Sequence, residues 1–332
     1  MKLATLKDGS RDGRLVVVSQ HGETALPAPV GWPTMQRALD DWDNAAPALQ
    51  DTSDKLNRDV GSGLPLDLTL LGAPLPRAYE WLDASAFLNH VKLVRQARGA
   101  ALPATLHTEP LIYQGGGSDL LGPAEPFLLA NEAWGLDFEG ELCAILGDVP
   151  QGVDAQAALQ SVRLLTIVND WTLRHLVSDE LAKGFGFVQA KPATTFGPFA
   201  VTPDELGDAW KDGRAHIELR CTYNGQVVGH TLAGPEMHFS FGDLIAHVAK
   251  TRRLGAGTLL GSGTISNVEP GRGFSCLVEQ RAREVLAHGK AVTPFMAVGD
   301  RIRIEALVPE TLDSPFGAIE QTVVAGRRPA AP

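Results

Sequence analysis

Acidic residues in this chain are spaced as metal ligands could be. Glu139 and Glu141 stand at i and i+2 in DFEGELCAIL (137–146), just ahead of an apolar run. On a strand, that spacing points both side chains to one face. Two unpaired carboxylates on a buried face would each cost several kcal/mol. A cation, a proton or open solvent could offset that cost.

Two further acids and a histidine extend the set. Asp83 lies seven residues before His90 in EWLDASAFLNH, and Asp170 ends the apolar run LLTIVND. Ligand sets made only of side-chain oxygens suit a hard cation, Mg²⁺ or Ca²⁺, better than Zn²⁺. The four acids together therefore form a candidate Mg²⁺ or Ca²⁺ site.

Each of these residues also has a simpler interpretation when it is taken alone. Glu139 and Glu141 could form the solvated face of an edge strand, because strands routinely leave one face polar. Asp170 could cap the helix that follows it. His90 could be a partly exposed surface histidine. Only the joint occurrence of these residues favours a functional site.

The segments that carry these residues are mostly strand-like. The segment 165–183 begins as a strand and becomes an amphipathic helix, 215–232 is a hairpin turning at an Asn-Gly pair, 241–254 is a helix, and 273–307 reads as strands and turns. Few and short helices argue against a doubly wound sheet or a TIM barrel. The predicted fold class is a β-rich α+β domain.

The first seventy residues show a different pattern of predicted elements from the rest of the chain. A strand at 13–19 is followed by turn residues and a possible return strand. We therefore predict a small N-terminal α+β domain at 1–72 and a main domain at 73–332. The terminal RRPAAP (327–332) is expected to fray.

Apolar residues at helical spacing also occur in this N-terminal part. They cover 32–59, where Pro33 suits the start of a helix and Pro47 predicts a break.

Composition narrows the function classes. The chain has 332 residues, 44% hydrophobic and 20% charged, with a formal charge of −10 spread along it. The absence of a basic patch argues against nucleic-acid binding. No run of 18 apolar residues is present to span a membrane. The isolated Cys143, Cys221 and Cys276, with no signal-peptide pattern, predict free thiols and a cytoplasmic protein.

Two common catalytic motifs are missing. GAGTLLGSGT (255–264) fails the G-x-G-x-x-[GA] pattern of a dinucleotide loop, since residue 260 is Leu. The serines at 118, 262 and 275 lack the G-x-S-x-G context of a nucleophile elbow. A serine hydrolase is therefore disfavoured.

The ordered series of motifs resembles the fumarylacetoacetate hydrolase family. The resemblance covers roughly 75–308 and runs through LDASAFLNH (82–90), YQGGGSDLLGP (113–123), DFEGELCAILG (137–147), VNDWTLRHL (168–176), KPATTFGPF (191–199), LLGSGTIS (259–266) and VGDRIRIE (298–305). It implies a mixed β-sandwich roll, a divalent metal and a homodimer. Longer members carry a small N-terminal domain, in line with the change of pattern near residue 72.

The resemblance also implies roles for individual residues. His90 matches the general base that activates water, and Glu279 matches the acid that orients it. In full, it assigns metal binding to Asp83, Glu139, Glu141, Asp170, Lys191 and Thr195, catalysis to His90, Glu279, Lys191 and Arg174, and substrate contacts to Ser85, Tyr113, Gln114 and Thr264.

The implied chemistry fits these residue types. Cleaving a C–C bond in a 1,3-diketo acid requires water to attack a carbonyl and a carbanion to leave as an enolate. A metal chelated by two neighbouring oxygens would stabilise that enolate, and Lys191 and Arg174 would help. A histidine oriented by a carboxylate suits removal of the water proton.

The substrate-contacting positions depart from the fumarylacetoacetases. Ser85 replaces a tyrosine, Val177 a glutamine, Leu181 a second tyrosine and Gly99 an arginine, although two other arginines lie close in sequence. We expect a hydrolase of a small fumarylacetoacetate-like diketo acid in aromatic-compound breakdown. The alternatives are a 2-oxo-acid hydratase, isomerase or decarboxylase on the same scaffold, and a non-catalytic binding protein.

Overall fold

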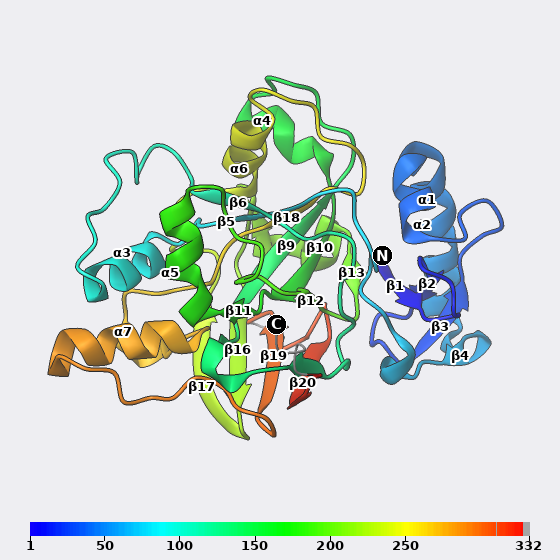
Figure 1. Cartoon of the computed structure of the whole chain (residues 1–332). Helices are drawn as coiled ribbons and strands as arrows, with labels where there is room; N and C mark the ends of the chain where they lie inside the picture. The colour runs from blue at the N-terminus through cyan, green and yellow to red at the C-terminus, as the bar shows by residue number, and fades with distance from the viewer. Residues whose placement is uncertain (310, 328–332) are drawn as a thin grey trace.

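A computed structural model of the chain, which describes residues 1–309 and 311–327, contains two large sheets (Figure 1). The expected fraying beyond residue 327 lies outside these residues. The longer sheet runs β4 (Leu64–Pro65), β3 (Thr24–Pro27), β2 (Arg14–Val18), β1 (Lys2–Leu6), β13 (Ala200–Val201), β10 (Val162–Asn169), β9 (Gly140–Leu146), β18 (Leu259–Gly261), β5 (Trp81–Ala84) and β6 (Ile112–Gly115), with β12 (Thr195–Phe196) also paired to β10.

The second sheet packs against the middle of the first. Its order is β17 (Gln226–Leu232), β16 (Glu218–Tyr223), β19 (Arg301–Leu307), β20 (Ala318–Ala325) and β7 (Phe127–Leu129). Strands β9 and β10 contact β16, β19 and β20, and apolar side chains of both sheets form one buried core. Two short ribbons pair β8 (Leu136–Asp137) with β11 (Thr172–Leu173), and β14 (Trp210–Lys211) with β15 (Arg214–Ala215).

Helices lie around the sheets rather than between their strands. They are α1 (Met35–Asp40), α2 (Trp42–Arg58), α3 (Leu88–Ala97), α4 (Ala155–Ala158), α5 (Arg174–Lys183), α6 (Phe241–Val248) and α7 (Leu277–His288), with 3₁₀ turns at Val60–Ser62, Leu68–Leu70, Glu132–Trp134, Leu159–Ser161, Pro203–Ala209 and Pro270–Arg272. Helices α3 and α7 pack together, and α5 lies on the same side of the molecule (Figure 1). These three helices and the strand ends beside them position the candidate site.

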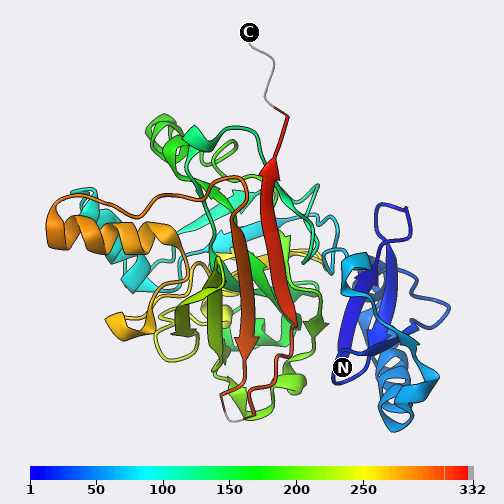
Figure 2. The ribbon, with the colours of Figure 1, turned by 90° about the horizontal axis from the view of Figure 1, so that it is seen from below.

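The N-terminal part forms a separate body at one side of the molecule (Figure 2). Strands β1 to β4 carry α1 and α2 against them, and Leu3, Leu15, Met35 and Leu49 are buried there. Strand β1 also pairs with β13, where Leu3 lies opposite Ala200. The sheet of this body therefore continues into the main sheet.

The predicted β-rich α+β fold with a small N-terminal domain is confirmed, and so is the hairpin of β16 and β17. Its turn residues Asn224 and Gly225 have φ angles of 48° and 79°. Positive φ at both central positions is the geometry of the two-residue turn for which Asn-Gly is favoured.

Two local expectations are wrong. Pro47 does not break the helix but lies inside α2, and the break falls at Asp41. The segment 273–307 is not only strands and turns, because it contains α7. The buried face of α7 includes Glu279, whose partner His90 is remote in sequence, and Glu284, which accepts from Thr293 nine residues on. These two acids mask the apolar periodicity of the helix.

Within the described residues, no helix is both long enough and apolar enough to cross a bilayer. All three cysteines are buried and free.

Candidate active site

Three carboxylates from neighbouring strands meet at one point of the main sheet. Asp83 lies in β5, Glu141 in β9, and Asp170 directly after β10. Strand β18 pairs with both β5 and β9, and β9 pairs with β10, so the sheet brings together residues far apart in sequence. One oxygen of each acid lies within 4.8 Å of the others, and the three residues are 6%, 0% and 0% exposed.

The electrostatics of this group call for a cation. Burial, and then the charge of Asp170, raise the pKa of Asp83 to about 8. Burial, and then Asp83 and Asp170, raise the pKa of Glu141 well above its ordinary range. Among the described residues, none is a hydrogen-bond partner of the buried Oε2 of Glu141. An all-oxygen donor set with an unpaired carboxylate oxygen fits a hard divalent ion.

Glu139 lies beside this group but is already paired with cations. Its Oε1 accepts from Arg174 at 2.7 Å and Thr264 at 2.9 Å, and its Oε2 accepts from Lys191 at 2.6 Å and Thr172 at 2.9 Å. Burial alone would raise the pKa of Glu139, but Arg174 and Lys191 lower it well below the ordinary range. Glu139 therefore lies outside the group of three acids whose oxygens are within 4.8 Å of one another, and its role as a metal ligand stays a prediction.

Lys191 pairs with the carboxylates, and Thr195 lies next to the threonine that contacts them. Lys191 Nζ donates to Glu139 and Asp170, and although burial alone would lower its pKa, those two carboxylates raise it. A protonated amine has no lone pair for a metal, so Lys191 acts as a counter-charge. Thr195 Oγ1 accepts from Trp171 Nε1 at 3.1 Å, and it is Thr194 that donates to Asp170.

Asp170 also accepts a hydrogen bond from a tyrosine and does not cap a helix. Tyr113 Oη donates to Asp170 Oδ2 at 2.6 Å, and the N-cap of α5 is Leu173. Lys191 Nζ lies 5.0 Å from the centre of the Tyr113 ring. The alternative interpretation of Asp170 as an N-cap is therefore wrong.

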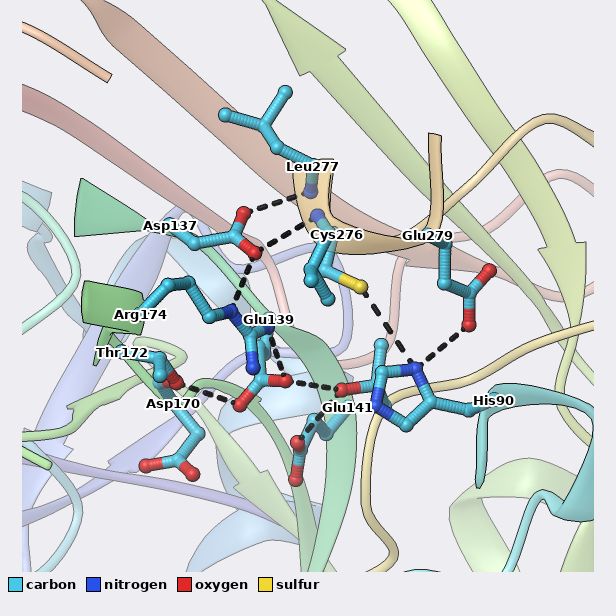
Figure 3. A network of polar contacts seen from close by, with 12 residues as sticks. His90, Asp137, Glu139, Glu141, Asp170, Thr172, Arg174, Cys276, Leu277 and Glu279 are labelled. Carbon is cyan, nitrogen blue, oxygen red and sulfur yellow. Dashed lines mark hydrogen bonds and ion pairs between the residues drawn. The ribbon is translucent and has the colours of Figure 1, made fainter. Parts of the chain in front are cut away.

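The structure brings the predicted base and its orienting acid together. His90 on α3 and Glu279 on α7 are joined by a 2.8 Å contact between Nδ1 and Oε1. Glu279 is fully buried, and Cys276 Sγ lies 3.9 Å from the same nitrogen. With Nδ1 engaged, Nε2 is the nitrogen left to act as a base. The imidazole stands between Glu279 and the pair Glu139–Glu141 (Figure 3).

Arg174 connects the carboxylates to a further buried acid. Its Nε donates to Asp137 Oδ2 at 2.8 Å, while a terminal nitrogen donates to Glu139. Arg174 is the first residue of α5, where the chain turns after β11. Asp137 and Glu139 thereby fix the direction of the guanidinium plane, and Arg174 supplies a buried positive charge beside the carboxylates.

These groups open into one cavity of about 300 Å³. Its lining includes carboxylates, Lys191 and His90, together with Arg95, Arg98 and apolar side chains. The apolar lining consists of Val91, Val94, Leu111, Ile112, Val177, Leu181 and Phe187.

Of the four residues predicted to contact substrate, three line this cavity and one does not. Ser85, Tyr113 and Thr264 line the cavity. Gln114 is exposed and outside the lining, because alternation along β6 turns it away from the face that carries Tyr113.

Sequence analysis missed Asp137, Thr172 and Thr194. A signal existed for Asp137, which continues the i, i+2 series of Glu139 and Glu141. Thr172 and Thr194 gave no signal beyond lying next to predicted residues, since their contacts with Glu139 and Asp170 depend on the fold.

Comparison with known protein families agrees with this architecture. Residues 81–324 match the model described as fumarylacetoacetate (FAA) hydrolase C-terminal, and residues 1–77 match fumarylacetoacetase N-terminal domain 2. The chain belongs to the fumarylacetoacetate hydrolase family. Enzymes of this family include isomerases and tautomerases as well as hydrolases.

Individual relatives show that variety. A 2,4-didehydro-3-deoxy-L-rhamnonate hydrolase from Sphingomonas sp. is 30% identical over 50% of this chain and 56% of its own length. The mitochondrial oxaloacetate tautomerase fahd2 of Xenopus laevis is 28% identical over 47% of each. The chain thus spans about half the length of these two relatives.

A solved structure shows the same fold over nearly the whole chain. Maleylpyruvate hydrolase from Sphingobium sp. SYK-6, in complex with manganese(II) and pyruvate, has a TM-score of 0.63 at 20% identity, covering 98% of this chain and 100% of that chain.

Proposed function

We propose that this chain hydrolyses a C–C bond of a 1,3-diketo acid in a metal-dependent reaction. The observation that carries the proposal is the single cavity lined by buried carboxylates and by His90, whose Nδ1 is held by Glu279. Asp83, Glu141 and Asp170 would hold Mg²⁺, Ca²⁺ or Mn²⁺. When bound, the ion supplies a Lewis acid for the two neighbouring substrate oxygens.

The residues around this site would carry the proton and charge movements. His90 Nε2 takes a proton from water, and Glu279 holds the ring in the required tautomer. Lys191 and Arg174 place two buried positive charges where the leaving enolate gains negative charge. Tyr113 and Glu139 keep Lys191 and its neighbours in place through the contacts described above.

Two arginines in the lining of the cavity suggest the substrate class. Arg95 and Arg98 line the cavity together, and burial, with the nearby charges of Arg174 and Arg95, lowers the pKa of Arg98. An anionic group would relieve this repulsion. The apolar walls at Val177 and Leu181 suit a carbon chain between two polar ends. We therefore propose a diketo acid with a second carboxylate, such as fumarylacetoacetate or maleylpyruvate.

The second candidate is a tautomerase or isomerase of 2-oxo acids, with a hydratase or decarboxylase as related possibilities. The relationship to an oxaloacetate tautomerase favours it. Forming an enolate needs the carboxylate-held ion and one base, but no attacking water. Oxaloacetate, a short dicarboxylic 2-oxo acid, would place its second carboxylate nearer to the metal than to Arg95.

Reaction in ¹⁸O-labelled water separates the two candidates. A hydrolase yields two acids, one of which carries a single ¹⁸O in its new carboxylate. A tautomerase changes only the rate of keto–enol exchange. Purified enzyme would be given both diketo acids and oxaloacetate, with Mn²⁺ or with chelator, and followed by mass spectrometry. Cleavage that survives chelation, or full activity of His90→Asn, would contradict the hydrolase proposal.

A further inference from the structure

Helix α7 begins without a cap of its own. Its N-cap residue is Cys276, whose side chain makes no capping hydrogen bond. The first backbone N–H groups of a helix need an acceptor, which Ser, Thr, Asp or Asn at the N-cap usually provides. Here the acceptor comes from β8: Asp137 accepts from Leu277 N at 2.7 Å and from Val278 N at 3.0 Å.

The same carboxylate holds Arg174. Asp137 Oδ2 accepts from both Val278 N and Arg174 Nε, and Asp137 is fully buried. A buried carboxylate at a helix N-terminus is favoured by the partial positive charge there. The guanidinium and the start of α7 are therefore held by one group, from opposite sides (Figure 3).

Arg174 and α7 each contact a different part of the candidate site. A terminal nitrogen of Arg174 donates to Glu139, which lies beside the three clustered carboxylates. Two residues into α7, Glu279 holds His90, at the base side. Asp137 itself is not part of the cavity lining. Its hydrogen bonds reach the site through Arg174 and through the start of α7.

We propose that Asp137 is a positioning residue that fixes the base His90 relative to the carboxylate side of the site. The expected effect on kcat rests on the proposed function. The expected effect on the position of His90 does not. Its rival is that Asp137 acts only as a remote helix cap and contributes to stability alone.

Substitutions separate the two roles. In Asp137→Asn the amide oxygen can still accept from Leu277 N, but the NH₂ group that replaces Oδ2 meets both Arg174 Nε and Val278 N with a donor. In Asp137→Ala both contacts are lost. Adding Cys276→Ser to Asp137→Ala supplies a local cap without restoring the contact to Arg174. Cys276→Ser alone is the reference for that double variant.

Two readouts are needed. The first is the melting temperature. The second is the low-field proton NMR signal of the His90 Nδ1–H bonded to Glu279, identified by its loss in Glu279→Gln. This signal needs no substrate, so it tests Asp137 even if the proposed reaction is wrong. Where diketo-acid cleavage is present, kcat and KM are measured as well.

We expect Asp137→Asn to lose or shift the His90 signal, with kcat reduced by roughly 10- to 100-fold, as for other outer partners of a site, and KM little changed. The double variant should regain melting temperature over Asp137→Ala without regaining the signal. Asp243→Asn, which alters the capping box of α6, serves as control: melting should fall and the signal should stay.

Two results would overturn the proposal. One is an unchanged His90 signal in Asp137→Asn. The other is recovery of the signal, together with melting temperature, when Cys276→Ser is added to Asp137→Ala. Either would show that Asp137 is only a cap.

Discussion

At the scale of single residues, the site is an arrangement of buried charges that are unequally compensated. Glu139 is neutralised within the protein by Arg174 and Lys191, whereas Glu141 keeps an oxygen without a partner. Burying like charges is costly unless a cation is added, and of these two glutamates Glu141 is the one whose charge is left uncompensated by the described residues.

The unequal compensation predicts how pH affects the metal-free protein. Because the pKa of Asp83 is raised to about 8, the folded state holds a proton that the unfolded state releases above its ordinary pKa of about 3.9. The free energy of unfolding should therefore fall as pH rises between those values, by up to about 1.4 kcal/mol per pH unit. Melting curves from pH 5 to 8 with chelator should show this decline, and saturating Mn²⁺ should flatten it. Equal slopes with and without metal would contradict the metal site.

Two adjacent threonines give a matched test of the ligand geometry. Thr194→Val removes the hydroxyl that donates to Asp170, and we expect Mn²⁺ affinity to fall by roughly tenfold. Thr195→Val instead leaves the buried Trp171 Nε1 without an acceptor, which should cost about 1–3 kcal/mol of stability with little effect on affinity. Calorimetric titration and thermal unfolding measure the two effects. A larger affinity loss in Thr195→Val would reverse the assignment.

At the scale of elements, the two sheets pack tightly against each other beside the carboxylates. A Cβ at Gly140 would lie 2.7 Å from Leu219 Cδ2 and 3.1 Å from Cys221 Sγ on β16. Glycine between Glu139 and Glu141 is therefore required by the opposing sheet. Its missing side chain lets β9 carry two acids on one face while the other face packs tightly.

Gly140→Ala should consequently destabilise the protein by about 1–3 kcal/mol, the usual cost of overpacking a core. Gly255→Ala is the control, because a Cβ there meets nothing within 4 Å. Denaturant unfolding compares the two variants. Equal stability of Gly140→Ala and wild type would mean that β9 and β16 separate easily.

The loop that delivers Lys191 is held by a single carboxylate. Glu180 in α5 accepts from the backbone N–H groups of Val188, Gln189 and Ala190. Glu180→Gln should loosen this loop, raise amide exchange across 184–190 and lower kcat by roughly tenfold through a less fixed Lys191. Exchange is read by mass spectrometry.

Glu284→Gln is the matched control, because Glu284 likewise accepts from the backbone of Val292 and Thr293, which lie outside the cavity lining. It should lose stability without losing activity. An unchanged exchange pattern in Glu180→Gln would exclude the anchoring role.

At the scale of the whole molecule, the N-terminal body shares its core with the main sheet. Leu3 and Val17 belong to the same buried cluster as Cys143 and Ile145 of β9. The two parts are also joined by the β1–β13 pairing. We propose that 1–72 supports the sheet that carries the carboxylates.

This arrangement predicts that both parts unfold together. Calorimetry of the full chain should give one transition, and Leu3→Ala should lower its midpoint as a whole, at a cost of about 2–5 kcal/mol. Two separable transitions, with only one moved by Leu3→Ala, would show that the N-terminal body folds independently.

The sequence by itself determined the reaction chemistry that is available. The types and spacing of Asp83, Glu139, Glu141, Asp170 and His90 pointed to an oxygen-ligand site with a base, and the strand alternation and the Asn-Gly turn pointed to a β-rich fold. These are local signals, because side-chain type and the two-residue period of a strand can be read along the chain.

Only the tertiary structure decided which charge meets which. The choice between Thr194 and Thr195, the pairing of Glu139 with cations, the helix at 277–288 and the part played by Asp137 all depend on contacts between residues 20 to 140 positions apart. The buried glutamates of α7 look polar in sequence. Glu279 pairs with the distant His90, and Glu284 accepts from the backbone of Val292 and Thr293 just beyond the helix. Such pairing gives no periodic pattern in the sequence, because the paired groups meet only in the folded protein.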